Sequence, residues 1–315
     1  MREYKEEIAR ILDEVNQVIL GKEDVILKSL IAIFARGHIL LEDIPGVGKT
    51  TLAIAFSRVM ELSHNRIQFT PDVLPSDVVG YTMLSKETQE EIYKPGAVMC
   101  NLLLADEINR TSSKTQSALL EVMEEGKVTV DKVTRKVPEP FVVIATQNPK
   151  GSVGTQMLPD SQLDRFMVCL SLGYPDSRSE VDMLRRHNGG GNVNKLDKII
   201  SLQQLHQMQE EIEQIYMHDA LYEYIVNLVQ RTRESLDIDQ GVSPRGTIAI
   251  MRMAKAAAYC FNRTYVVPDD VKFVFADVVK HRIFLSSQAR LQGISKVDVI
   301  ENIFRQTRAP RMVTK

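Results

Sequence analysis

Cysteine, tryptophan and unbalanced charge are scarce or absent in this sequence. The 315 residues include no tryptophan and three cysteines, and the formal net charge is -2. Because Cys100, Cys169 and Cys260 have no paired spacing, the sequence predicts neither a disulfide framework nor a zinc site. The nearly balanced charge argues against a chain sheathed in nucleic acid, and a hydrophobic content of 44% excludes a disordered chain.

Long hydrophobic runs are also absent. No run approaches the roughly 18 residues that a membrane-spanning helix needs, so no membrane span is expected. Residues 1–7 are mostly charged and contain no apolar core of a signal peptide. Together with the unpaired thiols, which suit a reducing compartment, these features predict a cytoplasmic protein.

Short apolar segments alternate with amphipathic helical segments over the first part of the chain. Continuous apolar strands separated by helices are typical of a parallel sheet that is covered on both faces. We therefore predict an α/β nucleotide-binding domain over residues 1–175 and, where the strands stop, an all-α domain over residues 176–315. The predicted strands are 38–42, 66–69, 102–105, 141–145 and 168–171. The predicted helices are 8–19, 23–36, 176–187, 196–215, 219–234, 244–260 and 268–284.

A glycine-rich segment follows the first predicted strand. Its residues are Asp43, Ile44, Pro45, Gly46, Val47, Gly48, Lys49, Thr50 and Thr51. The glycines let backbone N–H groups close around phosphates, and the helix that starts near Lys49 directs its positive end at the same anion. Lys49 supplies a charge for the β and γ phosphates, and Thr50 supplies a hydroxyl for Mg²⁺. The consensus opens with glycine where this chain has Asp43, and aspartate tolerates unusual backbone angles.

Two carboxylates end the third predicted strand. Asp106 lies 57 residues after Lys49, and Glu107 follows it directly. Because the carboxyl ends of parallel strands meet at one edge of a sheet, we expect this pair beside the phosphate loop. Asp106 is suited to hold Mg²⁺ through water, and Glu107 to polarise the water that attacks the γ phosphate.

Two further polar residues lie near the last predicted strands. Asn148 ends the fourth strand, where its amide could bond the attacking water or the γ phosphate. Arg165 precedes the fifth strand and could serve as an arginine finger, whose charge stabilises the transition state. Both residues are candidate catalytic residues.

Several strings of the sequence resemble the AAA+ ATPases, and specifically the MoxR family. The strings are Ile44-Pro45-Gly46-Val47-Gly48-Lys49-Thr50, Ala105-Asp106-Glu107-Ile108-Asn109-Arg110, Ala145-Thr146-Gln147-Asn148-Pro149 and Leu163-Asp164-Arg165-Phe166. Residues 69–77 are similar to a MoxR signature, and residues 241–246 are similar to the family's second sensor. The match runs over nearly the whole chain in the family's order.

The resemblance implies a P-loop AAA+ three-layer αβα domain with a parallel sheet and a smaller all-α lid. It implies that Val18, Ile19 and Gly21 contact adenine, that Arg245 senses the γ phosphate from the lid, and that Arg165 acts on the next subunit. Hairpins are implied at about 80–95 and 126–138. The family forms hexameric rings and is associated with chaperone-like maturation of protein complexes, often beside proteins with von Willebrand factor A domains. ATP and Mg²⁺ are therefore the expected ligands.

Alternative functions stay open at this point. A magnesium-chelatase motor subunit belongs to the same branch, and a DNA-directed AAA+ motor would share the motifs. The DNA motor would need a DNA-binding module that the sequence does not offer, so nucleic acid is not an expected partner. A nucleotide kinase is less expected, because a glutamate beside the metal aspartate suits water activation. Residues 245–315 hold 13 basic and 5 acidic side chains. This excess fits solvated helix faces or contact with the acidic remainder of a neighbouring subunit. A basic tail for nucleic acid is a third reading, which the lack of aromatic residues among the basic ones disfavours.

Overall fold

Five short strands form one parallel sheet at the centre of the protein. The computed structural model describes residues 4–44, 46–86, 89–148, 158–187 and 193–311. The strands are β1 (Ile39–Glu42), β2 (His64–Gln68), β5 (Leu102–Asp106), β8 (Val142–Gln147) and β9 (Val168–Leu170). They are ordered β2-β5-β8-β1-β9, and every neighbouring pair is parallel. The predicted α/β body with a parallel sheet is therefore confirmed.

The sheet divides the core of this body in two. Along β1, Ile39 and Leu41 face one cluster of buried apolar side chains, and Leu40 faces the other. Residues of β5, β8 and β9 alternate between the same two clusters. Since successive side chains of a strand point to opposite faces, continuous apolar strands of this kind need cover on both sides.

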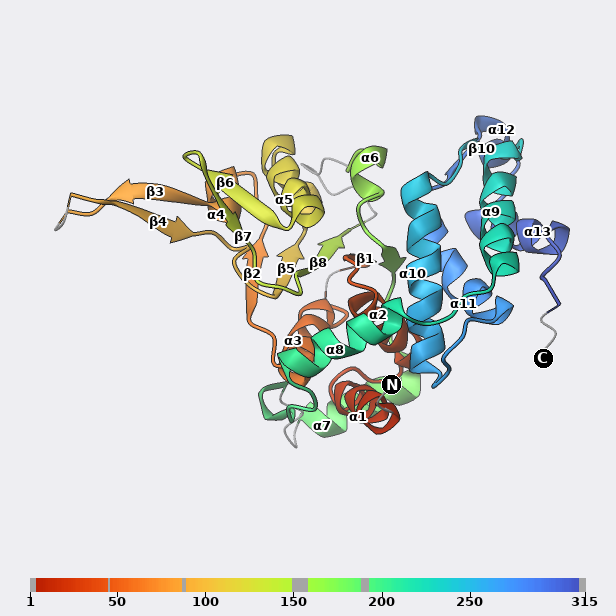
Figure 1. Cartoon of the computed structure of the whole chain (residues 1–315), viewed down its shortest axis with the longest axis horizontal. Helices are drawn as coiled ribbons and strands as arrows, with labels where there is room; N and C mark the ends of the chain where they lie inside the picture. Colours follow the sequence, from red (N-terminus) through yellow and green to blue (C-terminus); the bar gives the residue numbers. More distant parts are fainter. Residues whose placement is uncertain (1–3, 45, 87–88, 149–157, 188–192, 312–315) are drawn as a thin grey trace.

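Helices provide that cover and make three layers (Figure 1). Helices on one face include α1 (Lys5–Asn16), α2 (Glu23–Phe34), α3 (Lys49–Val59) and α8 (Leu202–Glu213). On the other face lie α4 (Pro75–Val79), α5 (Ser113–Glu125) and α6 (Asp160–Leu163). Short 3₁₀ helices occur at η1 (Ile108–Arg110) and η2 (Val193–Lys195), and α7 is Ser177–His187. No helix among the described residues is long and apolar enough to cross a membrane.

Two antiparallel hairpins extend from the body on the side away from the C-terminal helices (Figure 1). They are β3 (Gly80–Leu84) with β4 (Glu91–Pro95), and β6 (Lys127–Val130) with β7 (Val133–Lys136). The Arg135 guanidinium lies 4.0 Å from the centre of the Tyr93 ring and joins the hairpins. Both hairpins that the family resemblance implied are present.

The C-terminal part is mainly helical. Its helices are α9 (Asp219–Glu234), α10 (Pro244–Cys260), α11 (Pro268–Val279), α12 (Ser287–Leu291) and α13 (Lys296–Gln306). One difference from the sequence prediction is a short antiparallel pair, β10 (Ile238–Gln240) with β11 (Phe284–Leu285). Helix α11 therefore ends before the predicted 284. Helix α8 packs on α2, where the Gln209 side chain donates to the Ile33 carbonyl over 2.9 Å. The boundary at 175 stays a prediction.

Candidate functional site

The phosphate loop connects β1 to α3 at the carboxyl edge of the sheet. Gly46 and Gly48 have φ values of 86° and 97°, a left-handed region that glycine enters without strain. Lys49 begins α3, and its ammonium group donates to the carbonyl oxygens of Asp43 and Ile44 over 2.9 and 3.3 Å. Burial lowers the pKa of Lys49, while nearby carboxylates oppose the shift. The loop therefore holds a partly buried cation that bonds backbone carbonyls and, among the described residues, no carboxylate, which suits an incoming anion.

The acidic pair ends β5 beside this loop. The Asp106 carboxylate accepts bonds from Arg66 over 2.7 and 3.0 Å and from the Thr146 hydroxyl over 2.9 Å. Glu107 has a φ of 54°, and its backbone N–H donates to the same Thr146 hydroxyl over 2.9 Å. The left-handed backbone of a non-glycine residue costs roughly 1 kcal/mol, and this bond offsets part of the cost. Thr146 thus fixes both acidic residues.

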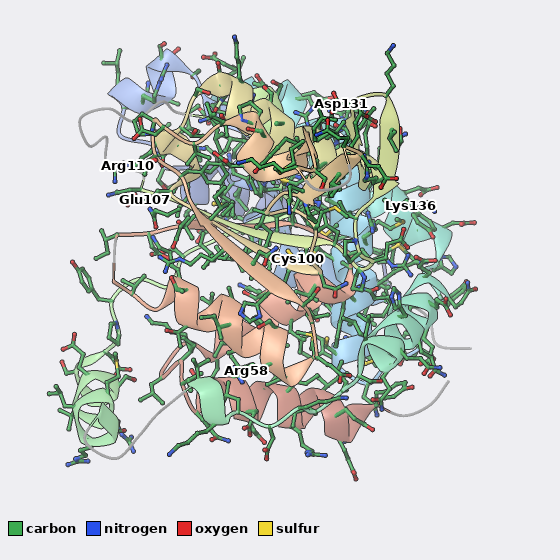
Figure 2. The ribbon with its side chains drawn as sticks, turned by 90° about the vertical axis from the view of Figure 1, so that its left-hand side faces the viewer. Arg58, Cys100, Glu107, Arg110, Asp131 and Lys136 are labelled. Carbon is green, nitrogen blue, oxygen red and sulfur yellow. The ribbon has the colours of Figure 1, made fainter. Side chains whose placement is uncertain are left out.

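The Glu107 carboxylate is held by two further donors. Gln68 donates over 2.9 Å, and Arg110 donates over 2.7 Å from the 3₁₀ helix that follows β5. Figure 2 shows Glu107 and Arg110 next to each other at one side of the molecule. The carboxylate is therefore oriented before any nucleotide binds.

One cavity of about 380 Å³ contains most of the predicted phosphate site. Its lining is Gly46, Gly48, Lys49, Thr50, Thr51, Arg66, Gln68, Asp106, Glu107, Thr146 and Asn148. A second cavity of about 650 Å³ shares Gly46, Gly48 and Thr51 with the first and adds Val18, Ile19 and Val47. Gly21 lies nearby, where an added Cβ would come within 2.3 Å of the Ser179 hydroxyl. A polar cavity and a more apolar one thus meet at the phosphate loop.

The predicted residues Arg165 and Arg245 lie elsewhere, at the amino edge of the sheet. Residues 37–38 precede β1 and residues 164–167 precede β9, so in a parallel sheet both gather opposite the phosphate loop. Arg165 Nε donates to the Glu124 carboxylate over 3.0 Å, and Arg245 bonds the same carboxylate. The structure therefore brings Arg165 and Arg245 together, and neither lines the phosphate cavity.

His38 fixes the end of α5 that carries Glu124. The backbone N–H of Val143 donates to Nδ1 of His38 over 3.0 Å, and Nε2 lies 3.0 Å from the Met123 carbonyl oxygen. Burial lowers the pKa of His38 to about 4, so the ring is neutral near pH 7. Its Nδ1 is then free of a proton and accepts from Val143. The His38 ring thus lies between β8, at Val143, and Met123, the residue before Glu124.

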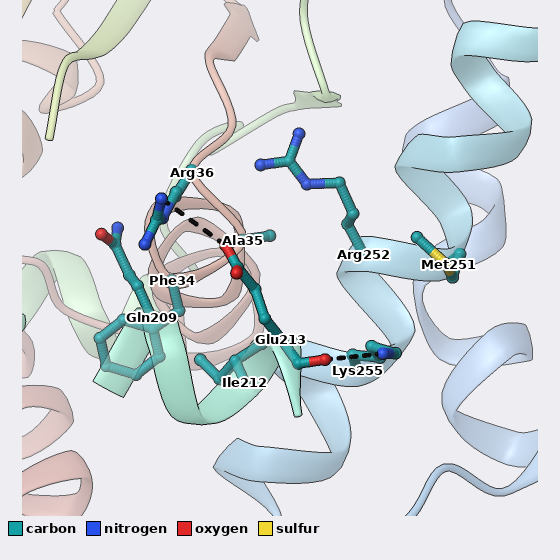
Figure 3. A pocket seen from close by; sticks show the side chains of 9 residues that line it. All are labelled: Phe34, Ala35, Arg36, Gln209, Ile212, Glu213, Met251, Arg252 and Lys255. Atoms are coloured by element: carbon teal, nitrogen blue, oxygen red, sulfur yellow. Dashed lines mark hydrogen bonds and ion pairs between the residues drawn. The ribbon is translucent and has the colours of Figure 1, made fainter. Parts of the chain in front are cut away.

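Two cavities rich in arginine lie along this edge. The cavity of about 420 Å³ around Glu124 is lined by Arg36, Arg165, Arg245, Arg252 and Arg282 among others. It shares Arg36 and Arg252 with a cavity of about 330 Å³ between α2, α8 and α10 (Figure 3). In the second cavity, Glu213 lies 3.6 Å from Arg36, and its backbone carbonyl accepts from Lys255 over 2.9 Å. The amino edge is strongly cationic.

Comparisons with known proteins identify the chain. Residues 38–168 match the ATPase family associated with various cellular activities (AAA), and residues 230–303 match the AAA lid domain. The chain is 37% identical to Chaperone MoxR1 of Mycobacterium tuberculosis, over 97% of this chain and 83% of that protein. It belongs to the MoxR family of AAA+ ATPases.

Two other relatives cover nearly all of both chains. Uncharacterized protein YeaC of Bacillus subtilis is 43% identical over 96% of this chain and 95% of its own. A crystal structure titled as that of a "putative ATPase" from Cytophaga hutchinsonii has 40% identity and a TM-score of 0.91 over 98% of this chain and 96% of that chain. The MoxR-family chain is thus an ATP hydrolase with an αβα domain and a lid.

Asp43 of this MoxR-family chain occupies the position of the first consensus glycine. Its φ is not positive, so the position does not require glycine. The buried carboxylate accepts from the Ser171 hydroxyl over 2.8 Å and from the backbone N–H groups of Leu172 and Gly173 over 2.7 and 2.9 Å. Asp43 therefore ties the phosphate loop to the segment after β9.

Replacing Asp43 is expected to destabilise the protein. Asp43→Ala leaves the buried N–H of Leu172 without its acceptor, which should lower the free energy of unfolding by about 2–3 kcal/mol. Asp43→Gly should do the same, although it restores the consensus. Urea unfolding measures both, with the exposed Asp13→Ala as a control. A more stable Asp43→Gly protein would mean that the aspartate is only tolerated at a glycine position.

Sequence reasoning on this MoxR-family site missed several residues. Arg66 and Gln68 are two residues apart on β2, so their side chains share one face of the sheet, and Gln68 is the register partner of Asp106. This period-two signal is present in the sequence. Thr146, two residues before the predicted Asn148, was also overlooked. Glu124 gave no signal, because nothing local distinguishes it from other glutamates of α5. Among the predicted residues, Pro45 lies outside those that the structure describes.

Proposed function

We propose that this ATPase hydrolyses ATP where two copies of the chain meet. The observation that supports the proposal is that the phosphate site and the two candidate arginines lie at opposite edges of the sheet. Lys49 and Glu107 lie at the carboxyl edge of the sheet, whereas Arg165 and Arg245 share Glu124 at the amino edge. In the part of the chain that the structure describes, the arginine that lines the phosphate cavity is Arg66, whose guanidinium is bound to Asp106, and both Arg165 and Arg245 lie away from that cavity.

In this proposal the carboxyl edge of the sheet binds ATP, and we call it the acceptor half of the site. Lys49 binds the β and γ phosphates, and the second cavity receives adenine against Val18 and Ile19. Asn148 lines the phosphate cavity and senses the γ phosphate. Glu107 takes a proton from the attacking water, since its carboxylate is already oriented by Gln68 and Arg110.

The donor set of this cavity fits Mg²⁺. The Thr50 hydroxyl and the Asp106 carboxylate line it together, and hydroxyl, carboxylate and phosphate oxygens are the ligands that Mg²⁺ prefers. Bound there, Mg²⁺ would neutralise negative charge on the β and γ phosphates. Arg66 and Thr146 hold the carboxylate in place for that role.

The amino edge of the sheet supplies the arginines for the neighbour's ATP, and we call it the donor half of the site. Both guanidinium groups remain partly exposed, with side-chain exposures of 27% for Arg165 and 42% for Arg245. In one chain alone, Glu124 supplies the negative charge between them. A neighbour's γ phosphate carries more charge and can replace it. We propose that Arg165 stabilises the transition state and that Arg245 senses the phosphate, both from the adjacent subunit.

Repetition of this contact builds a homo-oligomer, proposed as a hexameric ring. The relatives reported above match nearly the whole chain, and one is named a chaperone, which supports chaperone-like remodelling or maturation of protein complexes over a chelatase motor. Proteins with von Willebrand factor A domains are proposed as partners. Assay of Mg²⁺ insertion into a porphyrin, with candidate partner subunits, tests the chelatase alternative.

Assembly is expected to control activity. Turnover per subunit should rise from nanomolar to micromolar protein, because a lone chain has no finger at its phosphate site. The rise should shift to higher protein concentration as salt screens the contact between basic and acidic surfaces. ATPase rates and sedimentation velocity on the same samples check both points. A flat turnover from monomer to oligomer would contradict the proposal.

A further inference from the structure

A polar cluster around the buried Arg282 joins the finger segment to the lid. Asp164 immediately precedes Arg165, and Ser243 lies two residues before Arg245. The Ser243 hydroxyl lies 2.8 and 3.0 Å from the two Asp164 carboxylate oxygens. Arg282 Nε donates to the same carboxylate over 2.8 Å. One carboxylate thus connects the segments that carry both arginines.

Arg282 binds the finger segment along its backbone as well. Its guanidinium donates to the carbonyl oxygens of Asp164, Phe166 and Met167 over 3.0, 2.6 and 3.1 Å. The residue is only 4% exposed, although it follows α11 in the lid. His281 adds a contact, since its Nε2 lies 3.0 Å from the Phe166 carbonyl oxygen. The backbone on both sides of Arg165 is therefore held by the lid.

We infer that Asp164 and Arg282 are positioning residues, which fix the finger segment to the lid so that Arg165 and Arg245 meet a neighbour's phosphate as one rigid unit. The inference rests on the proposed function. Neither residue touches the nucleotide in this scheme. Both act through Arg165, whose backbone they hold.

The reason for such a cluster lies in what happens to Glu124. In the isolated chain Glu124 holds the tips of Arg165 and Arg245 together. When a phosphate replaces it, the tips lose that partner, and only contacts at the base can keep the two guanidinium groups oriented. At this base the Arg282 side chain is 2% exposed and the Asp164 side chain 21% exposed, so the pair is largely shielded from solvent and does not depend on Glu124. A donor held in advance stabilises a transition state without a cost of reorganisation.

The test measures turnover and ATP affinity in Asp164→Asn, where only turnover should fall. Asparagine keeps the size of the side chain but removes the charge that Arg282 binds. Turnover should fall about 10²-fold, the loss that a misplaced catalytic group produces, while ATP affinity stays unchanged. Asp160→Asn removes an exposed carboxylate of the same segment and serves as the matched control.

Mixing experiments separate positioning from general damage. The Asp164→Asn protein keeps an intact phosphate site, so mixing with Lys49→Ala, which keeps an intact finger, should restore activity at roughly a quarter of the contacts in an equal mixture. Mixing with Arg165→Ala should restore none, because neither chain has a working finger. Full turnover in Asp164→Asn, or rescue by both partners, would overturn the inference. Failure of Lys49→Ala to rescue Asp164→Asn, when it does rescue Arg165→Ala, would also overturn it.

A milder variant guards against unfolding. The Ser243 hydroxyl also caps α10, where it accepts from the backbone N–H of Gly246 over 3.1 Å. Ser243→Ala removes this cap and one bond to Asp164 but leaves the Arg282 pair, so its turnover should fall by less but show the same pattern of rescue. Ser295→Ala removes an equivalent helix cap in the lid, at α13, and should keep normal turnover. Thermal unfolding of all variants measures stability separately. Equal rates in Ser243→Ala and Ser295→Ala would contradict the inference. If Lys49→Ala and Arg165→Ala do not rescue each other, the proposed function itself fails.

Discussion

Arg165→Ala is expected to abolish turnover while leaving ATP binding intact. An arginine finger contributes on the order of 10³–10⁵ in rate, and Arg165 lies outside the phosphate cavity of its own chain. Mixed with Lys49→Ala, which is also inactive, it should regain activity, because an intact finger then meets an intact phosphate loop. Arg245→Ala should follow the same pattern with a smaller loss. Steady-state ATPase assays and nucleotide titrations measure these effects.

Arg305→Ala provides the control for Arg165→Ala. Arg305 is an arginine of α13 whose side chain is 78% exposed and pairs with Glu301 of the same helix. Its loss should leave turnover and mixing behaviour unchanged. Absence of rescue between Arg165→Ala and Lys49→Ala, in mixtures that assemble, would mean that the catalytic site is complete within one chain.

Glu107→Gln is expected to bind ATP normally and to lose hydrolysis by about 10²–10⁴-fold, the range for removal of a general base. The amide keeps the shape of the side chain but cannot take the proton from water. Lys49→Ala should instead weaken ATP binding, because the phosphates lose their main cation. Measured affinity and turnover distinguish the two variants. A slowed hydrolysis cycle should also prolong the client-bound state, so Glu107→Gln is the variant for client capture in ATP.

The control for this experiment is Glu121→Gln, an exposed glutamate of α5. It makes the same chemical change away from the cavity, so turnover should stay unchanged. Normal turnover in Glu107→Gln would remove Glu107 from the role of base and direct attention to its neighbour Asp106.

The sequence predicts that Lys49 and Asp106 lie close together, for a topological reason, and both line one cavity. Lys49 follows one apolar strand and Asp106 ends another. Because parallel strands end at one edge of a sheet, the pattern alone predicts that the two residues lie close together. The buried strands were predicted from the same pattern, because cover on both faces removes the polar alternation. Arg66 was missed although residues 66–69 are a predicted strand, because a polar side chain on a mostly exposed strand usually faces solvent.

The donor half could not be predicted in the same way. Asp164 and Arg282 are 118 residues apart, and no local pattern links the start of β9 to the end of α11. Without that link, the sequence leaves open where the lid sits and therefore which phosphate Arg245 can reach. The pair β10 and β11 was also missed, because strands of three and two residues form only through tertiary contact and have no stable pattern alone.

The opposite placement of Lys49 and Arg165 has a consequence for symmetry. A two-fold symmetric dimer joins the same surface of both partners. Lys49 and Arg165 lie at opposite edges of one sheet, so a two-fold contact does not bring one partner's finger to the other's phosphate loop. The proposed assembly has a direction instead. Each subunit depends on the neighbour at one side and serves the neighbour at the other. A substitution in the phosphate loop abolishes hydrolysis in its own subunit, whereas a substitution of the finger abolishes hydrolysis in the adjacent subunit. The effect of hydrolysis in one subunit on the next should therefore have one direction around the assembly.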